Sequence, residues 1–206
     1  GTPDSVKIKL YGDISWEIMG SDISSSLKYA EKELELSKKT SRKADIAQSE
    51  SDIANIYNRK GSFDTALVHY NLALALRKDL RQEDKMAGIY TNIATVLMRQ
   101  SKFKEALDIN FKALKIFEKK NDRASLSKQS ICLGNIGNLY YELEKNKEAE
   151  IFFRKGIALG EAAGDEITVG NILVNLGGIK YEYNQMDSAL YYWLKVEDVM
   201  TRNNRI

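Results

Sequence analysis

Carboxamide side chains recur along this chain of 206 residues at a nearly constant spacing. Asn92, Asn135 and Asn175 lie 43 and 40 residues apart, and Asp52 precedes the first of them by 40 residues. A carboxamide carries both a hydrogen-bond donor and an acceptor, so it can pair with the N–H and the C=O of a peptide backbone whatever that peptide's side chains are. The spacing therefore predicts a surface that binds extended main chain.

Residues that carry enzyme chemistry are scarce. One histidine, His69, and one cysteine, Cys132, cannot form an internal disulfide, a Cys/His zinc site or a Ser/His/Asp triad of the usual kind. The Ser-x-x-Lys spacing at 101–104 and 125–128 is expected by chance in a chain rich in both residues, and no phosphate-binding glycine loop accompanies it. We therefore expect no catalysis, no metal and no cofactor, with His69 at the surface and Cys132 in the core.

The charge balance disfavours nucleic acid as the partner of this part of the protein. The chain has 31 Lys and Arg residues against 29 Asp and Glu residues, a net charge of +2. A helical-repeat RNA reader, the least favoured alternative, would need a basic groove.

The sequence contains no stretch of 18 or more apolar residues, so no membrane span is predicted.

A period near forty residues organises the elements that would position these side chains. Alanines at 66, 106, 149 and 189 are each preceded, twelve residues earlier, by a second small residue: Ala54, Ala94, Gly137 and Gly177. The only proline is Pro3, so helix is favoured throughout. Two small residues per unit predict a helical hairpin whose helices cross closely, and Gly156, Gly160 and Gly164 predict a further close approach.

The hairpin turns and the unit boundaries follow from the same period. Gly61 and Asn184 suit a left-handed turn residue, whereas Ser101 and Glu144 at the same point are less favoured. We expect one solenoid over residues 5–200, because a short repeat cannot bury its apolar face alone. Its repeats are predicted at 5–40 (degenerate), 44–82, 86–121, 125–164 and 168–200, followed by a tail at 201–206.

The pattern resembles the tetratricopeptide repeat (TPR). The second repeat carries the signature residues of that family, which are Ile53, Ala54, Tyr57, Ala66, Tyr70 and Ala73. The segment 133–140, Leu-Gly-Asn-Ile-Gly-Asn-Leu-Tyr, is similar to the lengthened subclass found in kinesin light chains, Leu-Gly-Asn repeat proteins and bacterial sensory regulators. Glu50, Asn110, Lys180 and Val196 depart from the family pattern.

The resemblance implies an all-α, right-handed α-α superhelical solenoid of about five TPR-like hairpins. It also implies that asparagines on the concave face hold bound peptides. Residues spaced four, three and four apart on each first helix share one face. Together with two neighbouring tyrosines, these stripes give the predicted peptide-binding residues: Asp52, Asn55, Arg59, Asn92, Thr95, Arg99, Asn135, Asn138, Tyr141, Glu142, Asn171, Asn175 and Tyr181.

A plainer interpretation of the asparagines stays open, in which they bond to a neighbouring repeat or to water. The predicted function is a non-enzymatic interaction module that binds a peptide or partner segment, as the sensory or scaffold part of a larger regulator such as a transcriptional regulator or a sensor kinase. The alternative is structural self-assembly through an uncapped C-terminal end near Trp193. Gly1-Thr2-Pro3 looks like an engineered start, so a native leader could have been removed, and the compartment stays open between cytoplasm and periplasm.

Overall fold

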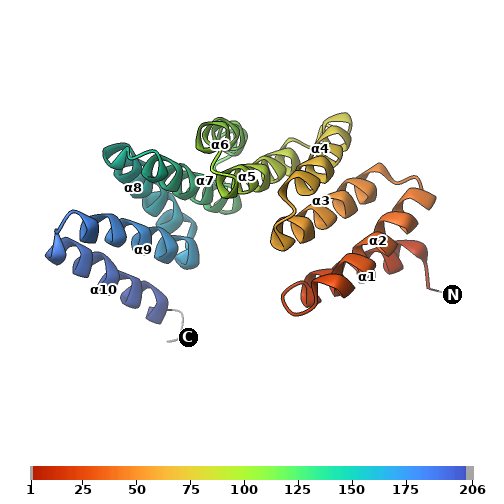
Figure 1. Cartoon of the computed structure of the whole chain (residues 1–206), viewed down its shortest axis with the longest axis horizontal. Coiled ribbons are helices and arrows are strands. Elements are labelled where there is room, and N and C mark those ends of the chain that lie inside the picture. The colour runs from red at the N-terminus through yellow and green to blue at the C-terminus, as the bar shows by residue number, and fades with distance from the viewer. Residues whose placement is uncertain (1, 203–206) are drawn as a thin grey trace. The chain divides into compact units, whose positions relative to one another are not determined.

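The computed structural model describes residues 2–202, which form ten α-helices (Figure 1). In chain order these are α1 (Asp4–Ile18), α2 (Ile23–Lys39), α3 (Lys43–Lys60), α4 (Phe63–Asp79), α5 (Glu83–Arg99), α6 (Phe103–Phe117), α7 (Arg123–Glu142), α8 (Asn146–Ala163), α9 (Glu166–Glu182) and α10 (Met186–Arg202). The all-α prediction is confirmed. Of the predicted tail, residues 203–206 lie outside the described part of the chain.

The helices fall into two compact units, each of which is described by itself. The N-terminal unit (Gly1–Gln100) contains α1 to α5, and the C-terminal unit (Ser101–Ile206) contains α6 to α10. Within each unit every helix packs against the next one along the chain. The pairs α1/α2, α3/α4, α7/α8 and α9/α10 are the expected hairpins, and within each unit the helices pack one on the next as in TPR-like repeats.

Small residues allow the helices of a hairpin to approach closely. A methyl group added at Gly137 of α7 would lie 2.5 Å from the ring of Phe153 on α8, and one at Gly177 of α9 would lie 2.4 Å from the indole of Trp193 on α10. Gly160 in α8 leaves similar room for the side chain of Val169, because a methyl group there would lie 2.6 Å from it. The close approaches at Gly137, Gly160 and Gly177 therefore require glycine.

A left-handed residue follows each of the helices α3, α5, α7 and α9. Its φ angle is +83° at Gly61, +58° at Ser101, +58° at Glu144 and +55° at Asn184. The turn at Gly61 closes when the amide of Ser62 donates to the carbonyl of Tyr57. The same backbone geometry thus recurs whatever residue type occupies the position, and only Gly61 adopts it without steric cost.

Candidate functional site

In the N-terminal unit, two stripe asparagines on successive first helices meet. The Nδ2 of Asn92 on α5 donates to the Oδ1 of Asn55 on α3 over 3.3 Å. The same Oδ1 accepts a hydrogen bond of 2.5 Å from the hydroxyl of Tyr70, a fully buried residue of α4. The amide of Asn55 is therefore held in one orientation by two neighbours.

The C-terminal unit repeats this arrangement. The Nδ2 of Asn175 on α9 donates to the Oδ1 of Asn138 on α7 over 2.9 Å. In both units the donor lies 37 residues after the acceptor, at matching positions of the period. In each unit the amide side chains of two successive first helices thus face each other. The interpretation in which the asparagines bond to a neighbouring repeat also predicts this contact.

The remaining polar stripe residues differ in their surroundings. Asn135 is half-buried and Asn171 is exposed. Among the described residues, no side-chain hydrogen bond is found for either amide. The hydroxyl of Thr95 donates to the carbonyl of Thr91 on its own helix over 3.1 Å. The stripe therefore contains amides that contact each other and amides that are open to a further partner.

Asp52 is the acidic member of the stripe. Its two carboxylate oxygens each accept a 3.2 Å hydrogen bond from the Nε2 of Gln48, one helical turn earlier. Burial raises the pKa of Asp52 to about 6, against the opposing effects of the Gln48 hydrogen bond and the charge of Arg77. The carboxylate is consequently ionised at neutral pH, but it protonates in mild acid.

The charged and aromatic stripe residues contact neighbouring helices of their own unit. Arg99 donates to the carbonyl oxygen of Asn58 over 2.9 Å, and its guanidinium lies 5.7 Å from the ring centre of Phe63. Tyr141 donates to the carboxylate of Glu182, and this hydrogen bond is the main reason that the pKa of Tyr141 is raised to about 12. Both contacts link successive repeats within one unit.

Three further predicted residues are open to solvent. Arg59 and Glu142 are exposed at the ends of their helices. Tyr181 is 53% exposed, although its ring lies 5.8 Å from that of Trp193. These side chains are placed where a ligand could reach them.

Comparisons with known proteins agree with this repeated arrangement of helical hairpins. Residues 85–162 match the family model described as Tetratricopeptide repeat. The chain therefore contains tetratricopeptide repeats. Within the described residues no helix is both long enough and apolar enough to cross a membrane.

A curated relative of this chain is distant in sequence. The protein KINESIN LIGHT CHAIN-RELATED 1 of Arabidopsis thaliana is 22% identical over 151 residues, which cover 72% of this chain. The chain spans only 25% of the length of that relative.

Solved structures are similar in fold at still lower identity. A Rap protein complexed with competence and sporulation factor has a TM-score of 0.83 at 15% identity, with 98% of this chain and 56% of that chain covered. Aspartyl phosphate phosphatase F from Bacillus subtilis has a TM-score of 0.77 at 19% identity, with coverage of 97% and 61%. At these identities the similarity concerns the fold alone.

Two departures from the TPR pattern mark polar contacts that sequence reasoning missed. Glu50 replaces the usual aromatic residue and is 4% exposed, and its Oε2 lies 2.7 Å from the Nδ1 of His69 on α4. The ring of His69 stacks on Tyr57 at 5.5 Å. His69 was predicted to lie at the surface, but a buried carboxylate and an aromatic ring hold it half-buried. An acidic residue at an aromatic position was the signal that could have revealed the contact.

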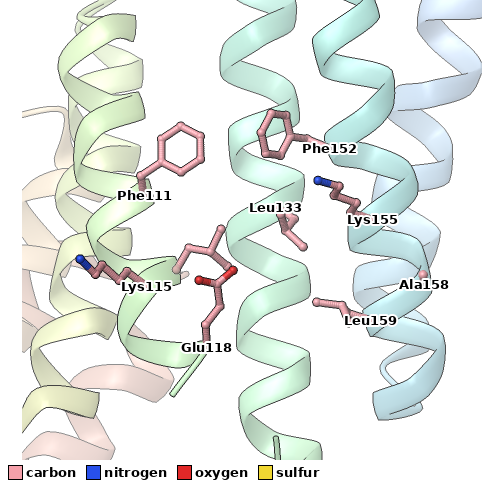
Figure 2. A pocket seen from close by; sticks show the side chains of 9 residues that line it. Phe111, Lys115, Glu118, Leu133, Phe152, Lys155, Ala158 and Leu159 are labelled. Carbon is pink, nitrogen blue, oxygen red and sulfur yellow. The ribbon is translucent and has the colours of Figure 1, made fainter. Parts of the chain in front are cut away.

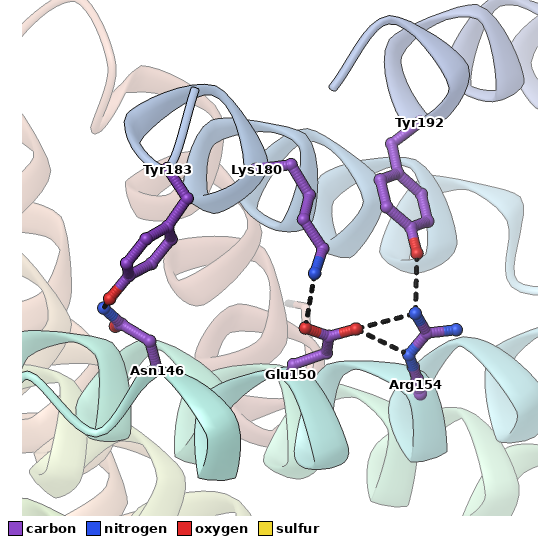
Figure 3. A network of polar contacts seen from close by, with 6 residues as sticks. All are labelled: Asn146, Glu150, Arg154, Lys180, Tyr183 and Tyr192. Carbon is purple, nitrogen blue, oxygen red and sulfur yellow. Dashed lines mark hydrogen bonds and ion pairs between the residues drawn. The ribbon is translucent and has the colours of Figure 1, made fainter. Parts of the chain in front are cut away.

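Lys180, the second departure, belongs to a polar network between α8, α9 and α10 (Figure 3). Its Nζ lies 2.6 Å from one carboxylate oxygen of Glu150, and Arg154 lies 2.7 Å from the other. Arg154 also donates to the hydroxyl of Tyr192 over 2.9 Å. Burial raises the pKa of Glu150, but the hydrogen bonds from Lys180 and Arg154 outweigh burial and lower the pKa overall. The network joins three helices of the C-terminal unit.

Proposed function

We propose that this TPR protein binds an extended peptide or a segment of a protein partner along the stripes of its first helices. The recurrence of one amide arrangement, Asn92 with Asn55 and Asn175 with Asn138, is the observation that supports this proposal. Neighbouring packed helices lie ~8–10 Å apart, and an extended chain advances ~3.3 Å per residue. One amide per repeat could therefore contact a bound main chain every few residues.

The amide pairs set the register of the ligand, and other contacts supply most of the affinity. Each hydrogen bond contributes only ~0.5–1.5 kcal/mol net. Exposed aromatic and charged side chains beside the stripe, such as Tyr181, Glu142 and Arg59, offer larger contacts. We propose that these side chains select the sequence that is bound.

The proposed role is one of binding without catalysis. The similarity to aspartyl phosphate phosphatase F is at 19% identity and carries the fold only. The Rap protein of similar fold was solved in complex with competence and sporulation factor, and this agrees with a recognition role. We propose further that the chain is the sensory or scaffold part of a larger regulatory protein, because a module of this kind has no chemical output of its own.

Peptides selected for binding to the wild-type chain test the proposal. Random peptides displayed on phage are selected, synthesised and measured by fluorescence anisotropy against Asn92→Ala, Asn135→Ala and Asn175→Ala. We expect the triple variant to lose about tenfold or more in affinity, since three hydrogen bonds of roughly 0.5–1.5 kcal/mol are removed. Asn71→Ala is the matched control, because Asn71 is exposed on the second helix α4 and lies outside the stripe.

The same variants separate a ligand-binding role from contacts between repeats. If the asparagines only join repeats, the triple variant will unfold at a lower urea concentration while every selected peptide binds with unchanged affinity. Unchanged affinity in a folded triple variant would contradict the proposal.

Self-assembly through α10 is a second candidate role, supported by one surface. Leu190, Tyr191 and Leu194 on this helix are 54%, 60% and 56% exposed. Trp193 is a poor site for a test, because its indole fills the space above Gly177 and its loss would disturb the fold. Sedimentation of Leu190→Asp and Leu194→Asp variants tests the idea, which fails if the wild-type chain is already monomeric at high concentration.

A further inference from the structure

A slot opens between the second helices α6 and α8 of the C-terminal unit, away from the asparagine stripes. Its volume is about 750 Å³. Leu133 of α7 and Leu114 of α6 border it, although only 5% and 6% of these residues is exposed. The apolar side chains that line it come from three helices and are Phe111, Leu114, Leu133, Phe152, Ala158 and Leu159 (Figure 2). A cleft of this volume with a mostly apolar lining is typical of a small-molecule site.

Two phenyl rings stand at one end of the slot. The ring centres of Phe111 on α6 and Phe152 on α8 are 5.8 Å apart, and the rings meet edge to face. From Phe111 to Glu118 the wall formed by α6 and the residues that continue it runs for seven residues, or ~10 Å at the helical rise of 1.5 Å per residue. A wall of this length with an apolar lining suits a single acyl chain.

The groove between α8 and α10 of the same unit contains the equivalent positions of the next repeat, so it can be compared with the slot. Between α8 and α10, Arg154 and Tyr192 occupy the positions of Phe111 and Phe152, 43 and 40 residues later, and they form a 2.9 Å hydrogen bond. Packing of successive hairpins therefore does not require the two phenyl rings. The rings make the α6/α8 slot apolar at a point where its neighbour is polar.

A salt bridge also divides the groove between α8 and α10. The equivalent residues of the slot form no salt bridge within residues 2–202. Lys195 lies 3.3 Å from Glu161, and both residues line two smaller cavities of about 370 and 230 Å³. The equivalent residues of the slot are Lys155 and Glu118. No ion pair joins these two within the described part of the chain, so the slot stays undivided.

The charges at the slot are positive on balance. Lys115 and Lys155 line it, against the single carboxylate of Glu118. The ammonium group of Lys155 is directed over the slot and lies 5.6 Å from the ring centre of Phe152 (Figure 2). A ligand with one anionic end would find an unpaired cation there, next to the apolar wall.

We propose that the α6/α8 slot binds a small amphiphilic anion, namely a medium-chain carboxylate. The acyl chain lies over Leu114 and Leu133, and the carboxylate contacts Lys155. Because the charged residues at the rim are exposed, their electrostatic contribution is small, and the apolar chain supplies most of the binding free energy. We expect a Kd on the order of 0.1 mM, which corresponds to about 5 kcal/mol.

Titration calorimetry with decanoate, below the concentration at which it forms micelles, tests the proposal. We expect saturable binding to the wild-type chain and about fivefold weaker binding to Lys155→Gln, since an exposed ion pair is worth roughly 1 kcal/mol or less. Ala158→Trp should abolish binding, because Ala158 is exposed on the wall of the slot and a larger side chain fills the space without entering the core. Lys112→Gln, on an exposed position of α6 that does not line the slot, should bind as the wild type does.

Several results would overturn the proposal. These are the absence of saturable binding, full binding by Ala158→Trp, or equal affinity for decanol and decanoate in the wild-type chain. Circular dichroism and the thermal midpoint establish that each variant is folded. Binding of an amphipathic helical peptide but not of decanoate would also overturn the proposal, and it would assign the slot to a protein partner.

Discussion

At the scale of single residues, the structure explains why glycine replaces alanine at one position of the repeat. Ala54 and Ala94 fill this position in the earlier repeats and Gly137 in the fourth, where the ring of Phe153 lies 2.5 Å from the place of a methyl group. We expect Gly137→Ala to lower the free energy of unfolding by ~1–3 kcal/mol, as overpacking does.

Urea denaturation measures this effect against a matched control in the same unit. Gly178→Ala places a methyl group on α9 where no atom lies within 4 Å. This control should raise stability by ~0.5–1 kcal/mol, because alanine is the better helix former. Equal effects of the two substitutions would refute the packing argument.

At the scale of helices and turns, the repeat imposes a left-handed residue even where the residue type resists it. Glu144, two residues after α7 ends at Glu142, has a φ angle of +58°. We expect Glu144→Gly to raise the free energy of unfolding by ~0.5–1 kcal/mol, because a side chain with a Cβ is strained in this region and glycine is not.

Thermal and urea unfolding again provide the measurement. Gly61→Ala should have the opposite sign at the equivalent turn, where φ is +83°. Asn184→Gly should have a smaller effect than Glu144→Gly, since asparagine tolerates the left-handed region. If Glu144→Gly lowered the stability instead, the side chain of Glu144 would make a contact that stabilises the fold by more than the left-handed conformation costs.

At the scale of the whole molecule, stability should depend on pH through a carboxyl group buried in the N-terminal unit. Glu33 is 3% exposed, and its pKa is raised from 4.5 to about 8, first by burial and then by the negative charge of Asp52. Between these two pH values the folded chain retains a proton that the unfolded chain has released. The free energy of unfolding should therefore fall as pH rises from 5 to 8 and level off above that range.

Urea unfolding at pH 5 and pH 8 measures this dependence. We expect a loss on the order of 3 kcal/mol for the wild-type chain, since one pKa unit corresponds to about 1.4 kcal/mol. Glu33→Gln removes the ionisable group and should flatten the profile above pH 6, while Asp52, whose pKa is about 6, contributes with the same sign below that value. An unchanged slope in Glu33→Gln would show that other groups control the effect.

The sequence by itself determined the helices, the period and the family. The spacing of small residues and the absence of proline after Pro3 were sufficient, because helix and repeat register depend on local patterns that recur along the chain. Cys132 was also predicted correctly as a core residue, since it lies beside Leu133 on an apolar face and is fully buried.

Only the tertiary structure decided how particular side chains pair. The hydrogen bond between Asn92 and Asn55, the contact of His69 with Glu50, and the bonds of Lys180 with Glu150 and of Arg154 with Tyr192 join residues from 19 to 38 positions apart. The α6/α8 slot likewise depends on side chains from three helices. Such contacts depend on the packing of one helix against another, which the type and spacing of residues along a single helix do not specify.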